Sequence, residues 1–509
     1  MEIYTYSLFS EVISTKIYYQ NDQLNLQKTM SKLSEILKKK GPIRKVGVIG
    51  MGYVGIPSAV LFAQHFDHVW GFQRASRTSG YKIEMLNNGI SPLKGEEPGL
   101  EDLIRKVRSL GRFESTSDFS KIKDVDAVTL AIQTPFKDKG ELEPDFSALE
   151  EGIRQIGKYL NEGSLVVLES TITPGTTQGF AADILKEESG LIPGEDFALA
   201  HAPERVMVGR LIRNIQEHDR IVGGINKEST GRAVELYTPV LTKGKIIAMD
   251  ATAAEVTKTA ENTFRDLQIA AMNELSLYCE AMGINVYDVR TGIDSLKGEG
   301  ITRAVLYPGA GVGGHCLTKD TYHLERGVKI SGSKLDYPAD SESLYVLARK
   351  INDFMPEHMY NLTNEGFARA GKKFKDSKIA LLGWAFLNNS DDTRNTPSEP
   401  YFDMVKKAGA SVCVHDPYVP EYGSIKISQD LEECVKGATA IVIFTGHKHY
   451  LNLKASALKK LTGCSHPIVI DGRNVIDPDS FIREGFVYKG IGRGDKNQHK
   501  ISEQMRKII

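Results

Sequence analysis

The sequence lacks the features that stabilise small secreted proteins and membrane proteins. Its 509 residues include five cysteines, an odd number with no Cys-x-x-Cys pair, which argues against a disulfide framework and a zinc ribbon. No apolar run approaches the roughly 18–20 residues that a membrane-spanning helix needs. Glu11 and Lys16 interrupt the apolar stretch at the N-terminus, so it is not a secretory signal. A reducing, cytoplasmic location is therefore predicted.

A dominant charge is also absent. Lysine and arginine total 64 and aspartate and glutamate 65, which leaves a net charge of −1. This balance predicts no general attraction to nucleic acid or to an anionic membrane, and no metal site is predicted. Hydrophobic residues make up 41% and charged residues 25% of the chain, an ordinary globular composition, so the length favours two to four domains.

Short apolar strands alternate with helical segments in two parts of the chain. Such alternation predicts parallel, doubly wound sheets with helices on both faces. The second set resembles the first, although it lacks the glycine-rich turn described below. Strands are predicted within residues 45–50, 68–72, 126–135 and 164–171 of the first set, and within 378–386, 438–447 and 467–474 of the second.

Helical spacing marks two further segments. Residues 252–282 contain no proline and are rich in alanine, glutamate and leucine. At ~1.5 Å per residue they form a helix on the order of 45 Å long, which would join the two sheets and could supply a dimer face. Residues 24–40 also have helical spacing, and we expect residues 1–42 to be an extension that packs on the surface or is partly disordered.

The first candidate site is a glycine-rich turn between the strand at 45–50 and the helix that follows. Its residues fit GxGxxG in the strand–turn–helix context that dinucleotide binding requires. The first glycine permits the tight turn, the second lets a pyrophosphate approach the backbone, and the third allows close helix–strand packing. The predicted cofactor contacts are Gly50, Met51, Gly52, Tyr53, Val54 and Gly55.

The acidic residue that usually binds the adenine ribose is missing. Gln73 takes its place, and Arg74 and Arg77 follow. Loss of the acid together with nearby arginines would accommodate the 2′-phosphate of NADP, whereas Gln73 could equally hydrogen-bond the ribose of NAD and leave the arginines solvated. Gln73 and Arg74 are predicted cofactor contacts in either case, and both cofactors stay open.

The strongest single segment is PGAGVGGHCLTKD at residues 308–320. Its four glycines would bring backbone amides close to a ligand and place Cys316 in the same loop. We expect His315 and Lys319 to lower the pKa of this thiol and make it nucleophilic. A buried, inert cysteine is the alternative, and we assign it to Cys279, Cys413, Cys434 and Cys464, which lie in apolar helical or strand-like contexts.

One face of the predicted long helix is polar. Lys258, Asn262 and Arg265 follow one another at i, i+4 and i+7 and therefore share that face. A solvated stripe is the usual explanation of such a pattern. The positions opposite are not uniformly apolar, however, which favours a ligand on the polar side.

Taken together, these segments resemble the UDP-glucose/GDP-mannose dehydrogenase family. The resemblance runs from about residue 45 to about residue 492 and rests on the order of GMGYVG, ESTITPGTT, APERVMVGR, KTAENTFRD, GVGGHCLTKD, DDTRNTP and DGRN. It implies an α/β fold of two Rossmann-like doubly wound parallel-sheet domains joined by a long central helix, and a homodimer or larger homo-oligomer. The division that we predict is an extension at 1–42, an NAD-binding domain at 43–250, a central dimerisation region with the cysteine loop at 251–370, a UDP-sugar-binding domain at 371–495 and a tail at 496–509.

The resemblance implies a double oxidation. The C6 alcohol of a UDP-sugar becomes a carboxylate at the expense of two NAD and one water, through a thioester on Cys316. Lys258 and Asn262 would stabilise the developing oxyanion. Further roles carried over from the family are water orientation or proton relay for Asp320 and Thr171, thioester hydrolysis for Glu204, and cofactor contact for Thr134, Thr171 and Arg394.

The sugar is less closely defined. APERV and the FRD triplet favour UDP-N-acetylhexosamines, with UDP-N-acetyl-D-mannosamine first and its gluco and galacto epimers and UDP-glucose as alternatives. Leu387 follows Phe386 where the family usually has lysine, so one substrate contact differs. A one-step hydroxyacid dehydrogenase and a non-catalytic sugar-nucleotide sensor are competing interpretations, which Cys316 and Lys258 argue against. The implied substrate contacts are Arg205, Val206, Lys258, Asn262, Arg265, Arg303, Gly313 and Phe386.

Overall fold

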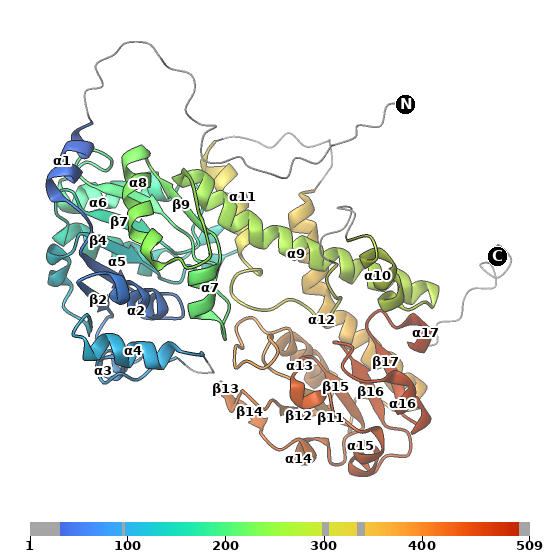
Figure 1. Cartoon of the computed structure of the whole chain (residues 1–509). Helices are drawn as coiled ribbons and strands as arrows, with labels where there is room; N and C mark the ends of the chain where they lie inside the picture. Colours follow the sequence, from blue (N-terminus) through green and yellow to red (C-terminus); the bar gives the residue numbers. More distant parts are fainter. Residues whose placement is uncertain (1–30, 94–96, 298–304, 333–341, 498–509) are drawn as a thin grey trace, which may run out of the picture.

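The computed structural model describes residues 31–93, 97–297, 305–332 and 342–497. Two sheets lie at opposite ends of this part of the molecule, and two long helices cross the space between them (Figure 1). Of the predicted N-terminal helix, the described part is α1 (Lys32–Lys40), which begins at the Ser31 cap. The remainder of that helix and Arg303 lie outside the described residues.

The N-terminal sheet has eight strands within the described residues, in the order β10-β9-β8-β7-β4-β1-β2-β3. All of its predicted strands are confirmed. Strand β9, however, runs antiparallel to β8, and β10 is parallel to β9, so the sheet is mixed at one edge. The strands are β1 (Lys45–Ile49), β2 (His68–Phe72), β3 (Phe113–Thr116), β4 (Ala127–Leu130), β7 (Leu165–Leu168), β8 (Ala198–His201), β9 (Arg220–Gly224) and β10 (Ile246–Asp250).

The C-terminal sheet has seven strands in the order β13-β14-β12-β11-β15-β16-β17, again within the described residues. It repeats the doubly wound plan, because β12 and β15 flank the first strand β11 and are parallel to it. A separate hairpin is formed by β5 (Phe136–Asp138) and β6 (Glu143–Pro144). The sheet strands are β11 (Lys378–Leu382), β12 (Ser411–His415), β13 (Glu421–Tyr422), β14 (Ile425–Ser428), β15 (Ala440–Ile443), β16 (Ile468–Asp471) and β17 (Val487–Gly490).

Helices cover both sheets and leave the carboxyl ends of their strands to the loops (Figure 1). Within the described residues, no helix is both long and apolar enough to cross a membrane. The domain boundaries given above stay a prediction. Around the first sheet lie α2 (Gly55–His65), α3 (Tyr81–Asn87), α4 (Leu100–Ser109), α5 (Ser147–Tyr159), α6 (Ala182–Ser189), α7 (Leu211–Glu217) and α8 (Lys227–Tyr237); around the second lie α13 (Ser398–Lys407), α14 (Leu431–Val435), α15 (Ala455–Thr462), α16 (Pro478–Arg483) and α17 (Gly494–Asn497).

The predicted central helix is confirmed as α9 (Ala251–Met282), which runs from the first sheet to the far side of the second (Figure 1). Asp250 caps its start, and Gly283, in the left-handed conformation, ends it. Helix α12 (Leu344–Arg369) packs across α9. The connecting segment carries α10 (Val286–Asp294) and α11 (Asp320–Ile330).

A buried polar network joins α9 to α12. The Arg349 guanidinium donates to Asp266 at 2.6 Å, and the Asn352 amide donates to the same carboxylate at 2.8 Å. Further along α9, Asn273 donates to the Asn352 side chain at 2.8 Å. Burial raises the pKa of Asp266 to about 6 even though Arg349 acts in the opposite direction. These polar pairs therefore fix the register of the two long helices, because sliding one helix along the other would break them.

The Arg349→Met substitution tests this network. It keeps a long side chain but leaves the buried Asp266 without its cation, so we expect a loss of about 3–5 kcal/mol in the stability of the central region. The measurement is the shift in the midpoint of chemical unfolding. Lys350→Met on the same helix removes an exposed pair with Glu342 and should change stability by only ~0–1 kcal/mol. Equal effects of the two substitutions would contradict the proposed importance of the pair.

Candidate active site

The glycine turn joins β1 to α2 and has the geometry predicted for a dinucleotide site. Gly50 has a φ of +97°, and a Cβ built on it would lie 2.4 Å from the Ala131 carbonyl oxygen. A Cβ on Gly55 would lie 2.0 Å from the Gly50 carbonyl oxygen. Gly52, in contrast, would carry a Cβ with no heavy atom within 4 Å. The first and third glycines are thus required by packing, and the second leaves open space for a ligand.

That open space belongs to a cavity of about 790 Å³ at the carboxyl ends of the first sheet's strands. It is lined by the turn, by the end of β2 and by the start of α5. Tyr53, Val54 and Gly55, also predicted as cofactor contacts, are not part of the lining, but α2 begins directly after the turn, and a helix N-terminus favours the phosphates of a dinucleotide. The lining includes Gly50, Met51, Gly52, Gln73, Arg74 and Lys82.

Gln73 has two partners in the protein. Its Oε1 accepts a hydrogen bond from the Met51 backbone amide at 3.2 Å, and its Nε2 donates to Ser79 Oγ at 3.0 Å. Gln73 therefore links the glycine turn to the turn at 76–79. Arg74 pairs with Glu151 at 3.0 Å, but both side chains are more than half exposed. The pair therefore contributes little to stability, and Arg74 can leave Glu151 for another anion.

The cysteine loop at 308–320 is fixed from two sides. The Gly309 amide donates to Asn273 of α9 at 2.9 Å, and the Gly314 amide donates to the Arg394 carbonyl oxygen at 2.7 Å. The side chain of Phe386 lies against Gly313 and Gly314, where a built Cβ would approach it to 2.4 and 2.8 Å. The glycines are thus needed for close contact with the C-terminal sheet, and the loop holds Cys316 between both halves of the molecule.

The electrostatic environment of Cys316 differs in part from the prediction. Burial raises the pKa of the thiol, and Asp320 adds to this effect, while Lys258, Lys319 and Arg394 oppose it. Burial also lowers the pKa of His315 to about 4, so this imidazole is neutral near pH 7. The expectation that His315 would help to lower the thiol pKa is therefore wrong. The cations that favour the thiolate are Lys258, Lys319 and Arg394.

The polar face of α9 is directed at this loop. Lys258 is buried, and the Asn262 amide donates to Asp320 Oδ2 at 2.5 Å. Lys319 Nζ donates to the other carboxylate oxygen of Asp320 at 3.2 Å. The structure thus brings Lys258, Asn262 and Asp320 together around Cys316. Arg265, two turns after Lys258, is exposed, and its place beside a substrate stays a prediction.

The loop after β7 connects α9 to the first sheet. Thr134 Oγ1 donates to the Thr171 carbonyl oxygen at 2.5 Å, which joins two of the predicted site residues. Glu255, one turn before Lys258, accepts hydrogen bonds from the amides of Gly175 and Thr177 at 2.5 and 2.8 Å. Burial raises the pKa of Glu255 to about 7. Glu255 was not among the predicted site residues, although its spacing of three residues from Lys258 on the same helix places both on one face.

The side chains of the APERV segment are largely engaged by other parts of the protein. Glu204 is buried in an ion pair with Arg220, which also binds Glu169 at 2.8 Å. Val206 packs against the core of the first sheet. Arg205 lies 3.6 Å from Glu261 of α9, so its side chain bridges the first sheet and the central helix. The roles of these residues in hydrolysis and substrate binding stay predictions.

Arg473 of the DGRN segment is a second residue that the sequence analysis missed. Its Nε donates to the Phe444 carbonyl oxygen at 2.9 Å. A Cβ built on Gly309 would lie 2.7 Å from one of its terminal nitrogens, so the guanidinium lies against the start of the cysteine loop. Burial lowers its pKa. DGRN is one of the segments that carry the family resemblance, so its arginine could have been predicted as a site residue.

In the second sheet, Asp416 takes the position that Gln73 has in the first, directly after the second strand of the unit. Asp416 follows β12, where an acidic residue would bind the ribose in a dinucleotide site. It instead accepts hydrogen bonds from the amides of Trp384 and Ala385 at 2.7 and 2.9 Å and from His447 at 3.1 Å. The loop after β11 and His447 therefore take up the hydrogen-bonding capacity of the Asp416 carboxylate.

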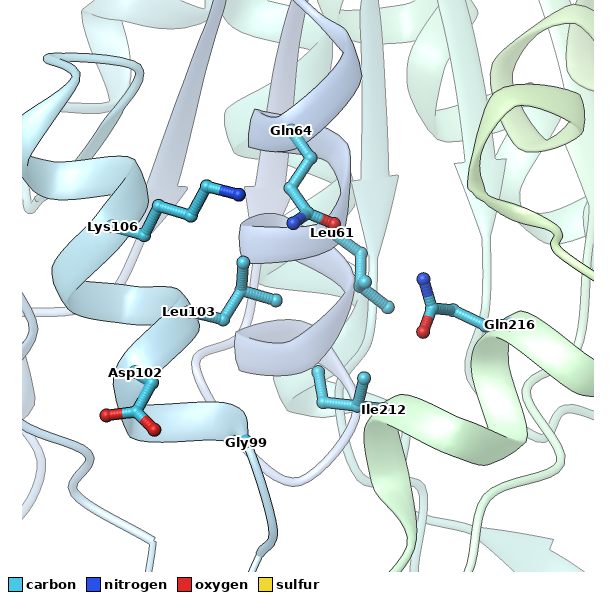
Figure 2. A pocket seen from close by; sticks show the side chains of 8 residues that line it. All are labelled: Leu61, Gln64, Gly99, Asp102, Leu103, Lys106, Ile212 and Gln216. Atoms are coloured by element: carbon cyan, nitrogen blue, oxygen red, sulfur yellow. The ribbon is translucent and has the colours of Figure 1, made fainter.

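A smaller concavity of about 290 Å³ lies on the helical layer of the first sheet, between α2, α4 and α7. Figure 2 shows Leu61, Leu103 and Ile212 converging at its base, with Gln64, Lys106 and Gln216 around them. It lies away from the strand ends and from Cys316, and we assign no chemistry to it.

Comparison with known proteins supports these observations. Three family models match the chain: the NAD binding, central and UDP binding domains of the UDP-glucose/GDP-mannose dehydrogenase family, at residues 44–241, 252–344 and 380–478. The UDP-N-acetyl-D-mannosamine dehydrogenase of Pyrococcus horikoshii is 36% identical over 89% of this chain and 100% of its own length. A crystal structure described as NDP-N-acetyl-D-galactosaminuronic acid dehydrogenase from Methanosarcina mazei Go1 is 70% identical, covers 93% of this chain and 100% of its own, and superposes with a TM-score of 0.86. A structure described as the Pyrococcus horikoshii UDP-D-ManNAc dehydrogenase, 36% identical, covers 89% of this chain and 100% of its own, with a TM-score of 0.78.

The residue type at position 73 is expected to determine the choice between NAD and NADP. In the Gln73→Asp variant a carboxylate would repel the 2′-phosphate of NADP, so the ratio of kcat/KM for NAD to that for NADP should rise by roughly tenfold or more. The measurement is initial-rate kinetics with each cofactor. Gln155→Asp, at another position in the cavity lining, controls for added charge. The expectation fails if the wild-type protein already excludes NADP as strongly as the Gln73→Asp variant does.

Proposed function

We propose that this chain, which belongs to the UDP-glucose/GDP-mannose dehydrogenase family, oxidises the C6 alcohol of a UDP-N-acetylhexosamine to the uronic acid. It is an NAD-dependent nucleotide-sugar dehydrogenase. The observation that carries the proposal is the position of Cys316, a partly buried thiol in a loop bound both to α9 and to the C-terminal sheet, with the charges of Lys258 and Asp320 acting on it. A dehydrogenase that performed one oxidation would need no such nucleophile.

The first-sheet cavity fits the cofactor. Gly52 leaves the backbone open to a pyrophosphate, α2 begins three residues later, and Gln73 lies where the adenine ribose would be bound. Bound NAD supplies the hydride acceptor for each oxidation. Thr134, Thr171 and Arg394 are the further contacts that we propose, and NADP remains an alternative until the substitution of Gln73 is tested.

The residues of the protein would then act on the sugar. Lys258 and Asn262 are placed to stabilise negative charge on the C6 oxygen, and Asp320 can take up the alcohol proton directly or through water. At the aldehyde level, the Cys316 sulfur forms a bond to C6 and gives a thiohemiacetal. Loss of the second hydride converts that adduct to a thioester, and water then breaks the C–S bond to release the carboxylate and the thiol.

The raised pKa of the Cys316 thiol is consistent with this order of steps. The thiol is protonated before substrate binds, because burial and Asp320 outweigh the cations. Attack on the aldehyde therefore requires loss of the thiol proton, and Lys258, Lys319 and Arg394 favour the thiolate at that stage. For thioester hydrolysis, we propose that Thr171 and Asp320 orient the water and that Glu204 assists while Arg220 holds it in place.

Two sugars are candidates. The motifs and the 36% identical Pyrococcus relative favour N-acetyl-D-mannosamine. The 70% identical Methanosarcina structure, whose name refers to N-acetyl-D-galactosaminuronic acid, favours the galacto epimer as the second candidate. We propose Arg205, Arg265, Gly313 and Phe386 as substrate contacts, with the Val206 backbone beside them. Arg303, a further proposed contact, lies outside the described residues.

We further propose that the chain forms a homodimer through its central helix. Large apolar side chains along α9 are exposed, and they offer a surface to a second copy of the chain. The exposed fraction is 55% for Phe264 and 61% for Tyr278. A second copy of α9 would cover these side chains.

A panel of UDP-sugars tests the proposed reaction. Each sugar is incubated with NAD and with NADP, and reduced cofactor and uronic acid are both measured. We expect one UDP-N-acetylhexosamine, the manno or galacto epimer, to give two reduced cofactors for each uronic acid. One reduced cofactor and an aldehyde or ketone product would indicate a simple dehydrogenase. Binding without any reduction would indicate a sugar-nucleotide sensor.

The Cys316→Ser variant tests the covalent step. A serine hydroxyl ionises far less readily than a thiol, so steady-state formation of uronic acid should fall by roughly 10³-fold or more, with enzyme-bound aldehyde or ester accumulating. Single-turnover assays with mass spectrometry of the protein detect the bound species. Cys464→Ser, in the C-terminal sheet region, is the matched control and should retain activity. Near-normal turnover of the Cys316→Ser variant would rule out the thioester mechanism.

A further inference from the structure

The loop between β11 and α13 holds the backbone of the cysteine loop. The Arg394 carbonyl oxygen accepts a hydrogen bond from the Gly314 amide at 2.7 Å, and the Asn395 side chain donates to the Gly314 carbonyl oxygen at 3.0 Å. Both polar groups of Gly314, two residues before Cys316, are thus bound by adjacent residues of this loop. Any displacement of Arg394 and Asn395 would therefore be passed to the nucleophile.

The side chain of Arg394 is held by a neighbouring acid. Its Nε donates to Asp392 Oδ1 at 2.8 Å, and a terminal nitrogen donates to Oδ2 at 2.5 Å. Such a two-point pair fixes the plane of the guanidinium as well as its position. The Asp392 side chain is only 11% exposed, and its carbonyl oxygen accepts from the Phe386 amide at 3.1 Å, so the acid itself is well anchored.

Arg394 lies close to both the cofactor turn and the nucleophile. Burial raises the pKa of the Cys316 thiol, and the charge of Arg394 opposes that effect. Burial, together with the charges of Asp391 and Asp392, raises the pKa of Tyr53 in the glycine turn to about 12. The charge of Arg394 acts on Tyr53 in the opposite direction. The guanidinium is 41% exposed, and it is the cofactor contact proposed above.

We infer that Asp392 is a positioning residue that fixes Arg394 for the bound dinucleotide and so couples cofactor binding to the cysteine loop. The chain of contacts runs from the dinucleotide to the Arg394 guanidinium, and from the Arg394 carbonyl to Gly314 and Cys316. The inference rests on the proposed cofactor contact of Arg394. It does not depend on which sugar is oxidised, because it concerns binding of NAD in the absence of sugar.

The chain provides a matched control. Asp391 and Asp392 are adjacent, carry the same charge and both act on Tyr53, but the two-point pair with Arg394 is formed by Asp392. If NAD binding depends only on the negative charge, removing either aspartate should have the same effect. If it depends on the pair with Arg394, only the substitution of Asp392 should weaken binding.

The first measurement is the Kd for NAD of Asp392→Asn and Asp391→Asn, determined by calorimetry without sugar. We expect Asp392→Asn to weaken NAD binding by roughly tenfold or more, because the guanidinium loses a charge-assisted contact, and Asp391→Asn to change it by less than about twofold. In an Arg394→Lys background, Asp392→Asn should have little further effect. Equal Kd changes for the two asparagine variants, or a full additional loss in the Arg394→Lys background, would overturn the positioning role.

The second measurement follows Cys316 itself. The rate of its alkylation by iodoacetamide is measured by mass spectrometry of the Cys316 peptide, with and without NAD. NAD should change this rate in the wild-type protein and in Asp391→Asn, and the change should be lost in Asp392→Asn. Asp392→Glu, which keeps the charge, should restore part of it if the asparagine variant is poorly folded. An NAD effect that persists in Asp392→Asn, or is missing from the wild type, would overturn the coupling.

Failure of the proposed function has a different signature. If no UDP-sugar is oxidised but NAD binds and the Asp392 effects appear, the reaction is wrongly assigned and the coupling stands. If a UDP-N-acetylhexosamine is oxidised with two reduced cofactors but the two aspartate variants behave alike, the reaction stands and the coupling is wrong.

Discussion

The buried ion pair between Asp266 and Arg349 is the constraint on which the site depends. It fixes the register of α9 against α12, and neighbouring members of the same network hold the cysteine loop. Asn273 binds the amide of Gly309, and the Arg349 guanidinium lies 3.5 Å from the Leu317 carbonyl oxygen. Because a buried charge without its partner is costly, few other arrangements of the two helices are accessible. The polar face of α9 therefore meets Cys316 in one orientation.

The sequence was sufficient for those parts of the fold that local patterns determine. Four strands of the first sheet, three of the second and the extent of α9 follow from short apolar runs and from the absence of proline, and the glycine turn follows from a fixed spacing, whereas the remaining strands were not predicted. The antiparallel direction of β9 was not predictable in this way, since strand direction depends on which neighbours pair after folding. The two arginines that lie against the cysteine loop, Arg394 and Arg473, are far from it in the sequence, and only one of them was assigned a role.

The chemistry of the site was predicted less completely, because pKa values depend on burial. His315 looked like a cation beside the nucleophile, but its burial leaves it neutral. Glu255 looked like one of many helix carboxylates, yet it is buried and holds the loop after β7. Asp416 stands where a ribose ligand would be expected in the second sheet, and only the structure reveals that backbone amides take up its hydrogen-bonding capacity.

The anchoring of the cysteine loop has a consequence for how two oxidations can use one cofactor cavity. Gly313 and Gly314 lie against Phe386, and the loop is otherwise bound to α9 and α12, whereas the walls of the cavity belong to the first sheet. In the proposed mechanism, a sugar attached to Cys316 would be held by the cysteine loop, while the first sheet would supply most of the dinucleotide cavity and Arg394 would contact the dinucleotide from the other side. In that mechanism the spent cofactor would leave and a fresh one would enter while the covalent bond to Cys316 keeps the half-oxidised sugar on the protein.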